Sequence, residues 1–111
     1  MLVIAVLLLN MKIVSTFEPR MYDIISVQSD YIEFHWNILP YDVRYKIWYW
    51  PGNKTSQLRT LHTYAPYALI GNLVPGQLYN VWLMGVQHSD VTTDYIAFQQ
   101  VTGTGLIPQH F

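Results

Sequence analysis

The stretch Leu73-Val74-Pro75-Gly76-Gln77-Leu78-Tyr79 predicts a sharp turn that leads into a strand. Pro75 fixes its own φ and Gly76 tolerates a positive φ, so the chain can reverse here between two sheets. Tyr79 lies just past the turn, where its ring can be buried while its hydroxyl bonds to backbone near the corner. We therefore expect Tyr79 to serve a structural role.

Short alternating strands surround this turn in the sequence. After Phe17, apolar and aromatic residues recur with a period of two, and turn residues interrupt them about every ten positions. The predicted strands are Ile24–Val27, Tyr31–Trp36, Arg44–Trp50, Leu58–Tyr64, Tyr67–Ile70, Leu78–Gln87 and Tyr95–Val101. The predicted loops are Asn37–Asp42, Pro51–Lys54 and His88–Asp94. Short strands without helices between them indicate an antiparallel sandwich or barrel, because parallel sheets need helical crossovers.

The composition of the 111 residues excludes several classes of protein. Six Lys and Arg against seven Asp and Glu give a net charge of −1, which is not the cationic character of a nucleic-acid binder. A hydrophobic content of 51% is too high for an intrinsically disordered chain. The absence of cysteine excludes a disulfide scaffold, a thiolate zinc site and a cysteine nucleophile.

The turn and residues of two predicted strands before it resemble the fibronectin type III module. Leu73, Pro75, Gly76 and Tyr79 form its Leu-x-Pro-Gly-x-x-Tyr pattern, and Trp36 is placed like the core tryptophan of that family. The alternating residues Tyr45, Ile47 and Tyr49 resemble the inward-facing set of the module's third strand. The resemblance covers residues 21–104 and implies an all-β, immunoglobulin-like antiparallel sandwich of seven strands. An immunoglobulin domain would carry a cysteine pair around the tryptophan, so the cysteine-free chain favours the type III version.

The expected core lies between the two sheets of this sandwich. It includes Trp36, Tyr45, Ile47, Tyr79 and Val81. The Trp36 ring is large enough to span the gap of about 10 Å between packed sheets. Tyr79 would form the tyrosine corner that Greek-key sandwiches use.

The sequence contains no pattern typical of catalysis or of metal binding. The histidines are His35, His62, His88 and His110, and they lack the spacing of metal ligands. His88, Ser89 and Asp90 are the residue types of a hydrolase triad, but neighbours along a strand end point to opposite faces. The glycines form no phosphate-binding loop, and the carboxylates lack calcium-loop spacing. We therefore expect no enzymatic activity, no metal and no cofactor.

The first 16 residues differ in character from the rest of the chain. Leu2–Leu9 is a run of eight apolar residues, whereas a helix needs about 20 to cross the hydrocarbon core of a membrane. The run suits the apolar region of a secretory signal peptide, although no Lys or Arg precedes it. The alternative is a cropped segment whose first strand is simply apolar. The expected organisation is a leader over 1–16, a domain over 17–105 and a tail or linker start over 106–111.

Asn53-Lys54-Thr55 is a sequon for N-glycosylation within a predicted turn. Such sequons also arise by chance. The resemblance adds to this signal, because type III modules occur mostly in the ectodomains of adhesion proteins, receptors and matrix proteins. Together with the apolar leader, the sequon predicts a glycoprotein that is secreted or lies on the extracellular side of the cell surface.

The most informative residues for function are large aromatics that alternate with the inward set. The residues predicted to share the outer face of one sheet are Trp48, Trp50, Trp82 and Met84. Solvent-facing strands normally carry Thr, Lys, Glu or Arg, so three Trp and a Met indicate a surface that contacts a partner. The alternative is that Arg44 and Lys46 cover Trp82 and Trp48 through cation–π contacts.

The sequence thus predicts a non-catalytic protein-interaction module of an adhesion or receptor type. Its partner would be a protein, namely an adjacent module, a second copy or a ligand protein. Nucleic acid is not expected, and a membrane would be reached only through a parent protein or an uncleaved leader. Replacing Trp48 and Trp82 together by Thr is expected to leave the fold intact and abolish association. The alternative function is a carbohydrate-binding accessory module, for which Asn80, Arg44 and Lys46 would supply the polar contacts.

Overall fold

The computed structural model describes residues 21–38, 43–88 and 92–105. The predicted leader over 1–16 and tail over 106–111 lie outside these residues. Among the described residues there are seven strands and one short 3-10 helix, which are β1 (Tyr22–Val27), β2 (Ile32–Trp36), β3 (Arg44–Pro51), η1 (Thr55–Gln57), β4 (Arg59–Thr63), β5 (Tyr67–Ile70), β6 (Leu78–Val86) and β7 (Thr92–Val101). In this part of the chain no helix has the length and hydropathy that a membrane crossing requires.

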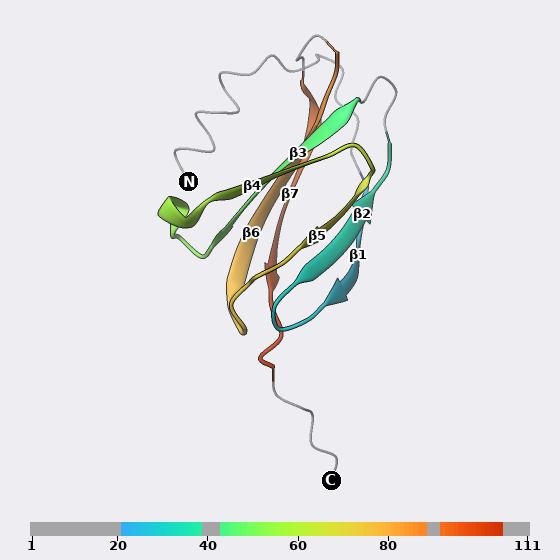
Figure 1. The fold of residues 1–111 in the computed structure, drawn as a ribbon. Coiled ribbons are helices and arrows are strands. Elements are labelled where there is room, and N and C mark those ends of the chain that lie inside the picture. The colour runs from blue at the N-terminus through green and yellow to red at the C-terminus, as the bar shows by residue number, and fades with distance from the viewer. Residues whose placement is uncertain (1–20, 39–42, 89–91, 106–111) are drawn as a thin grey trace.

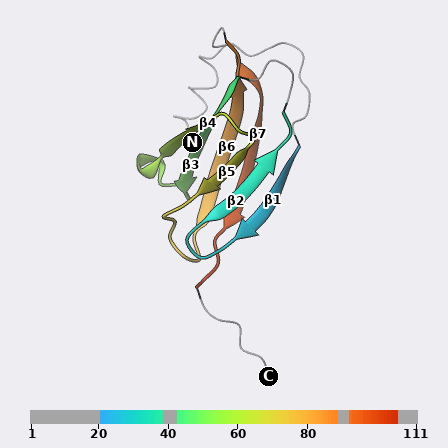
Figure 2. The same ribbon diagram turned by 45° about the vertical axis from the view of Figure 1, so that its right-hand side comes forward.

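The strands form two antiparallel sheets that pack face to face (Figures 1 and 2). One sheet has three strands in the order β1-β2-β5, and the other has four in the order β4-β3-β6-β7. Every strand pair is antiparallel. This arrangement confirms the predicted seven-stranded, immunoglobulin-like β-sandwich.

The predicted strand ends differ from the observed ones mainly at β7. The loop expected over His88–Asp94 is shorter, because β7 already begins at Thr92. The extra residues pair with β6: Val86 lies opposite Thr92, after an irregularity in the register that follows the pair Met84 and Tyr95. Such bulges are not marked by alternation, so the sequence pattern stops short of them.

The main core lies between the sheets, where the alternating residues of both inner faces meet. All five residues expected there, Trp36, Tyr45, Ile47, Tyr79 and Val81, are buried. The Trp36 ring packs edge-on against Tyr45, with the ring centroids 5.2 Å apart. Contacts of this kind between aromatic rings in a packed interior fix how one sheet sits on the other.

The turn before β6 has the geometry that a tyrosine corner requires. The backbone N–H of Val74 donates a hydrogen bond of 2.9 Å to the Tyr79 hydroxyl, and Gly76 has a φ of 66°. Buried Thr102, just after β7, secures the same turn: its hydroxyl donates to the Val74 carbonyl at 2.6 Å and accepts from the Gln77 N–H at 3.0 Å. Leu73 is buried beside them, so the turn is anchored to the core on one side and to the end of β7 on the other.

Candidate functional site

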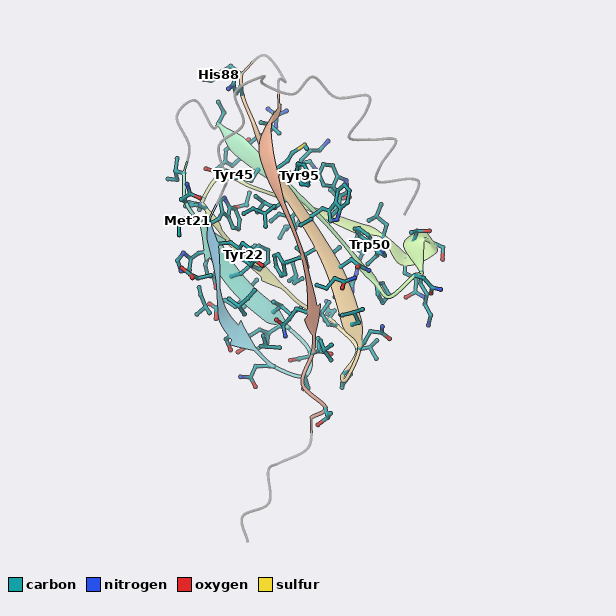
Figure 3. The ribbon with its side chains drawn as sticks, turned by 180° about the vertical axis from the view of Figure 1, so that it is seen from behind. Met21, Tyr22, Tyr45, Trp50, His88 and Tyr95 are labelled. Carbon is teal, nitrogen blue, oxygen red and sulfur yellow. The ribbon has the colours of Figure 1, made fainter. Side chains whose placement is uncertain are left out.

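The outer face of the four-stranded sheet carries the aromatic residues singled out from the sequence. Strand register places them in adjacent rows across β3 and β6: Trp48 lies opposite Trp82, and Lys46 lies opposite Met84. On β7, Ala97 pairs with Trp82, and Tyr95 pairs with Met84. We call Trp48, Trp50, Trp82 and Met84 the outer-face cluster. In Figure 3, which shows the molecule from behind, Trp50 lies toward η1 and Tyr95 lies along β7.

The outer-face cluster is a second hydrophobic cluster, separate from the main core. Trp50 and Trp82 have ring centroids 6.2 Å apart, and Trp82 stacks on Tyr95 at 5.7 Å with an interplanar angle of 26°. Leu58, just after η1, packs against the cluster from the β4 side of the sheet. The rings therefore form a continuous apolar band from η1 across to β7.

The expectation that the whole cluster is exposed is wrong for three of its four residues. Trp48 is 5% exposed, while Trp50 and Met84 are each 0% exposed. Trp82 is half-buried, and its neighbour Tyr95 remains 38% exposed. Alternation correctly assigned these residues to the outer face, but whether a face meets solvent depends on what lies over it, which alternation does not specify.

The cation–π contact between Lys46 and Trp48 that was considered from the sequence is present. The Lys46 ammonium lies 5.6 Å from the centroid of the Trp48 ring, within the range of an attractive interaction. Lys46 is itself half-buried, so its aliphatic stem covers part of the indole while the charge stays near solvent. Lys46 therefore covers part of the cluster.

A buried amide closes the cluster at the end nearest η1. Asn80 lies opposite Trp50 in the register and is buried. Its amide N–H₂ donates to the Gly52 carbonyl at 2.6 Å, and its carbonyl accepts from the Gln99 side chain at 2.8 Å. Because these bonds are made within the domain, the Asn80 side chain is committed to the fold.

The outer face of the three-stranded sheet is different in kind. This face carries both polar and apolar side chains, and most of them are exposed, including His35, Tyr67 and Leu69. The Tyr67 hydroxyl donates a hydrogen bond to the Glu33 carboxylate, and that bond raises the pKa of Tyr67. The His35 imidazole lies 3.7 Å from the Asp23 carboxylate. This face is an ordinary solvent-facing sheet surface, which makes the aromatic content of the other face more distinctive.

The remaining sequence candidates do not gather into a site. Among the described residues there is no group of three or more His, Cys, Asp or Glu that could hold a metal ion. His35 lies on β2, His62 on β4 and His88 just after β6, while Ser89, Asp90 and His110 fall outside the described residues. Asn53 is exposed in the turn between β3 and η1, where the Lys54 N–H donates to the Pro51 carbonyl at 2.9 Å.

Sequence reasoning misses two residues of this apolar band, Leu58 and Tyr95. Alternation predicts a strand that includes Leu58, but this residue lies just before β4 and packs on the cluster. Tyr95 lies in a strand as predicted, but its pairing with Met84, and so its place beside Trp82, depends on the register of β6 and β7. The signal for Tyr95 is present in the sequence, because inward Ile96 implies that its neighbour on the same strand faces outward.

Comparison with known proteins identifies the architecture. No protein-family model and no curated protein matches the sequence. The chain is similar in structure to the solution structure of the fn3 domain of human collagen alpha-1(XX) chain, with a TM-score of 0.69 and 15% sequence identity. The match covers 86% of this chain and 97% of that one. With the strand order and the tyrosine corner described above, it shows that this chain has a fibronectin type III-like fold.

Proposed function

We propose that the chain acts as a protein-interaction module of an adhesion or receptor type, with a protein partner bound on the β6–β7 side of the outer-face cluster. The fibronectin type III fold is generally that of a non-catalytic interaction module. The observation that carries the proposal is the apolar band from η1 to β7 itself. A domain of this kind already has its core between the sheets, so a second cluster on an outer face is not needed to build the sandwich.

The contact would centre on the part of the band that reaches solvent. Trp82 is half-buried and Tyr95 is 38% exposed, and the two rings stack. Next to them on β7, Ala97 and Gln99 are exposed and offer a small apolar side chain and a polar one. Aromatic residues that are held rigid and surrounded by small or polar neighbours are typical centres of protein interfaces. Trp48, Trp50 and Met84 would support these rings from below.

The kind of partner follows from the chemistry of this surface. An apolar aromatic centre fits another protein surface, whether an adjacent module, a second copy or a ligand protein. The few cations of the chain argue against nucleic acid, and a membrane would be reached only through a parent protein or the leader. A secreted or cell-surface location is part of the proposal. It is supported by the exposed position of Asn53, which would carry a glycan, and by the apolar leader of the sequence.

Carbohydrate binding is the second candidate, since the stacked Trp82 and Tyr95 could support a sugar ring. The polar groups that such a platform needs are already engaged, however. Asn80 is buried and bonded to Gly52 and Gln99, and Lys46 lies over the Trp48 ring. A sugar would have to compete with these internal contacts, so the surface suits a protein better.

The proposal can be tested by placing a photoreactive benzoylphenylalanine at position 95 in the full chain, expressed in secretory cells. The matched control carries it at position 67, because Tyr67 has a similar exposure of 41% but lies on the opposite sheet. We expect a protein cross-link from position 95 and little from position 67. A cross-link from position 67 alone, equal cross-linking from both, or none from position 95 would contradict the proposed surface.

A further inference from the structure

In the part of the chain that the structure describes, β7 is the least protected edge of the two sheets. It ends the strand order β4-β3-β6-β7 and is ten residues long. The other edge strands are shorter: β5 has four residues, β4 has five, and β1 has six with a register shift between Ile24 and Ser26. Natural sheets guard their edges with short strands, bulges, charged residues or proline. The stretch Tyr95–Val101 of β7 contains no charged residue and no proline.

The hydrogen bonds at the end of β7 fix the direction of its backbone groups. The Thr102 N–H, just after β7, donates to the Gln77 carbonyl beside β6 at 3.0 Å. The next N–H, that of Gly103, points the other way and donates to the Gln28 carbonyl at 2.9 Å. These directions alternate along a strand of an antiparallel ladder, and the register with β6 is regular over residues 95–101. The odd-numbered residues of this stretch therefore direct their N–H and C=O groups away from β6.

Ala97 and Gln99 present these outward backbone groups at the middle of the edge. Both residues are exposed, and none of the described strands pairs with β7 on the side away from β6. A row of backbone donors and acceptors at the edge of a sheet is a template for a further strand. Gly103 marks one limit of this template, because its N–H is already bonded.

We propose that β7 pairs antiparallel with β7 of a second copy of this chain, with the two-fold axis at Phe98. Ala97 then lies opposite Gln99 of the second copy, and the two residues exchange backbone hydrogen bonds. This register is the longest self-pairing that stays within residues 95–101. Moving the axis to position 97 would shorten the pairing, and moving it to position 99 would oppose Tyr95 to Gly103, whose N–H is already engaged.

The side chains of the outer face favour a second copy over an unrelated strand. The proposed register opposes Tyr95, which is 38% exposed, to Val101 of the second copy, which is 51% exposed. Aromatic and β-branched residues form favourable cross-strand pairs, and the two-fold axis repeats this pair on its other side. Because the stretch is uncharged, no like charges face each other across the axis. Two copies of this edge are therefore complementary.

The pairing would join the four-stranded sheets of two copies into one continuous sheet. The stacked rings of Trp82 and Tyr95 from both copies would then share one outer face, on either side of the axis. This inference rests on the proposed function and deepens it, because it names the protein partner and gives it a register. A partner of another sequence on the same face would remove the inference and leave the proposed function intact.

Proline at the edge tests the pairing in the full chain. Ala97→Pro removes an N–H that points away from β6, so the ladder between β6 and β7 keeps its bonds. Leu69→Pro on edge strand β5 is the matched control: the Trp36 N–H donates to the Pro66 carbonyl at 3.1 Å, so alternation also directs the Leu69 N–H away from β2. In sedimentation velocity we expect a concentration-dependent dimer for the wild type and for Leu69→Pro. Ala97→Pro should weaken the association by at least about tenfold.

Because the chain has no cysteine, single cysteines test the register without a proline. Ala97→Cys and Gln99→Cys chains are mixed and oxidised. Directly opposed residues of a hydrogen-bonded pair have Cα atoms about 5.5 Å apart, which suits a disulfide. The same position in two copies lies on the diagonal, about 7–8 Å apart, which is too far. We therefore expect a disulfide between the two variants, and little from either variant alone or from Leu69→Cys.

Three outcomes would overturn the inference: a wild-type chain that is monomeric at about 1 mM, an Ala97→Pro chain that associates like Leu69→Pro, or equal disulfide yields from mixed and single variants. Growth beyond a dimer would also contradict it, because a two-fold pairing of edges is closed. A monomeric chain that still cross-links to another protein from position 95 would refute the second copy and support the proposed surface. A monomeric chain without that cross-link would contradict both.

Discussion

At the scale of single residues, two hydroxyl groups illustrate how context sets the role of a tyrosine. The Tyr79 hydroxyl accepts a hydrogen bond from the Val74 N–H inside the domain, while the Tyr67 hydroxyl donates to Glu33 on an exposed sheet face. The first secures the turn that joins the two sheets. The second changes the ionisation of an exposed side chain and should contribute little to the fold.

Replacing Tyr79 by Phe should lower the free energy of unfolding by about 1–3 kcal/mol, because the Val74 N–H loses its acceptor while the ring still packs. Denaturant titration measures this loss. Tyr64→Phe serves as the control, since Tyr64 is 79% exposed and should show no change. Equal stability of the Tyr79→Phe protein and the wild type would mean that the hydroxyl is solvated and the corner is not formed.

Trp48 and Trp82 should respond differently to substitution, although they face each other across β3 and β6. Because Trp48 is buried, Trp48→Thr should cost about 3–5 kcal/mol, as expected for the loss of a buried tryptophan. Trp82 is half-buried, so Trp82→Thr should cost only about 1–2 kcal/mol. This replaces the expectation, drawn from the sequence, that both could change without loss of stability. Similar small losses for both variants in denaturant titration would show that Trp48 is not covered.

The pH dependence of the Tyr67–Glu33 pair has a definite sign. The hydrogen bond to the Glu33 carboxylate raises the pKa of Tyr67, so the folded state favours the protonated hydroxyl. Its contribution to stability is present below the ordinary tyrosine pKa of about 10 and is lost as the pH rises through the raised value. Glu33→Gln should therefore lower the pH at which Tyr67 ionises, measured by NMR with Tyr67→Phe to assign the signal. An unchanged ionisation would show that the pair is not formed in solution.

At the scale of elements, the turn between β5 and β6 depends on backbone conformation as much as on side chains. Gly76 has a φ of 66°, in the left-handed region that other residues adopt only with strain. Its N–H donates to the Gly103 carbonyl at 2.8 Å, which ties the turn to the segment after β7. The turn therefore holds the start of β6 next to the end of β7, which is far from it in the sequence.

Gly76→Ala should destabilise the domain by about 1–2 kcal/mol, the cost of a left-handed conformation for an L-residue with a Cβ. Gly71→Ala is the matched control, because the nearest atom to an added Cβ there is 3.8 Å away and no unusual φ is required. The midpoint of denaturant unfolding compares the two. Equal midpoints would mean that the turn does not hold the left-handed conformation in solution.

At the scale of the whole molecule, period-two alternation and one turn motif were enough to predict the sandwich. They also assigned Trp36 and Tyr45 to the inside and Trp48 to the outer face, because strand periodicity fixes which residues share a face. They could not predict that Trp48 and Trp50 are buried, since burial on an outer face depends on contacts from other segments. They also could not predict the extended β7, whose first residues pair after a register irregularity.

The central claim is that a protein partner binds the aromatic surface around Trp82 and Tyr95. The most direct measurement is the affinity of the partner recovered by cross-linking for two double variants, Trp82→Thr with Tyr95→Thr and Tyr67→Thr with Leu69→Thr. Loss of two aromatic contacts at the centre of an interface should weaken binding by at least about tenfold. The second variant, on the opposite sheet, should bind like the wild type. Unchanged affinity of the first variant, or a greater loss in the second, would contradict the account.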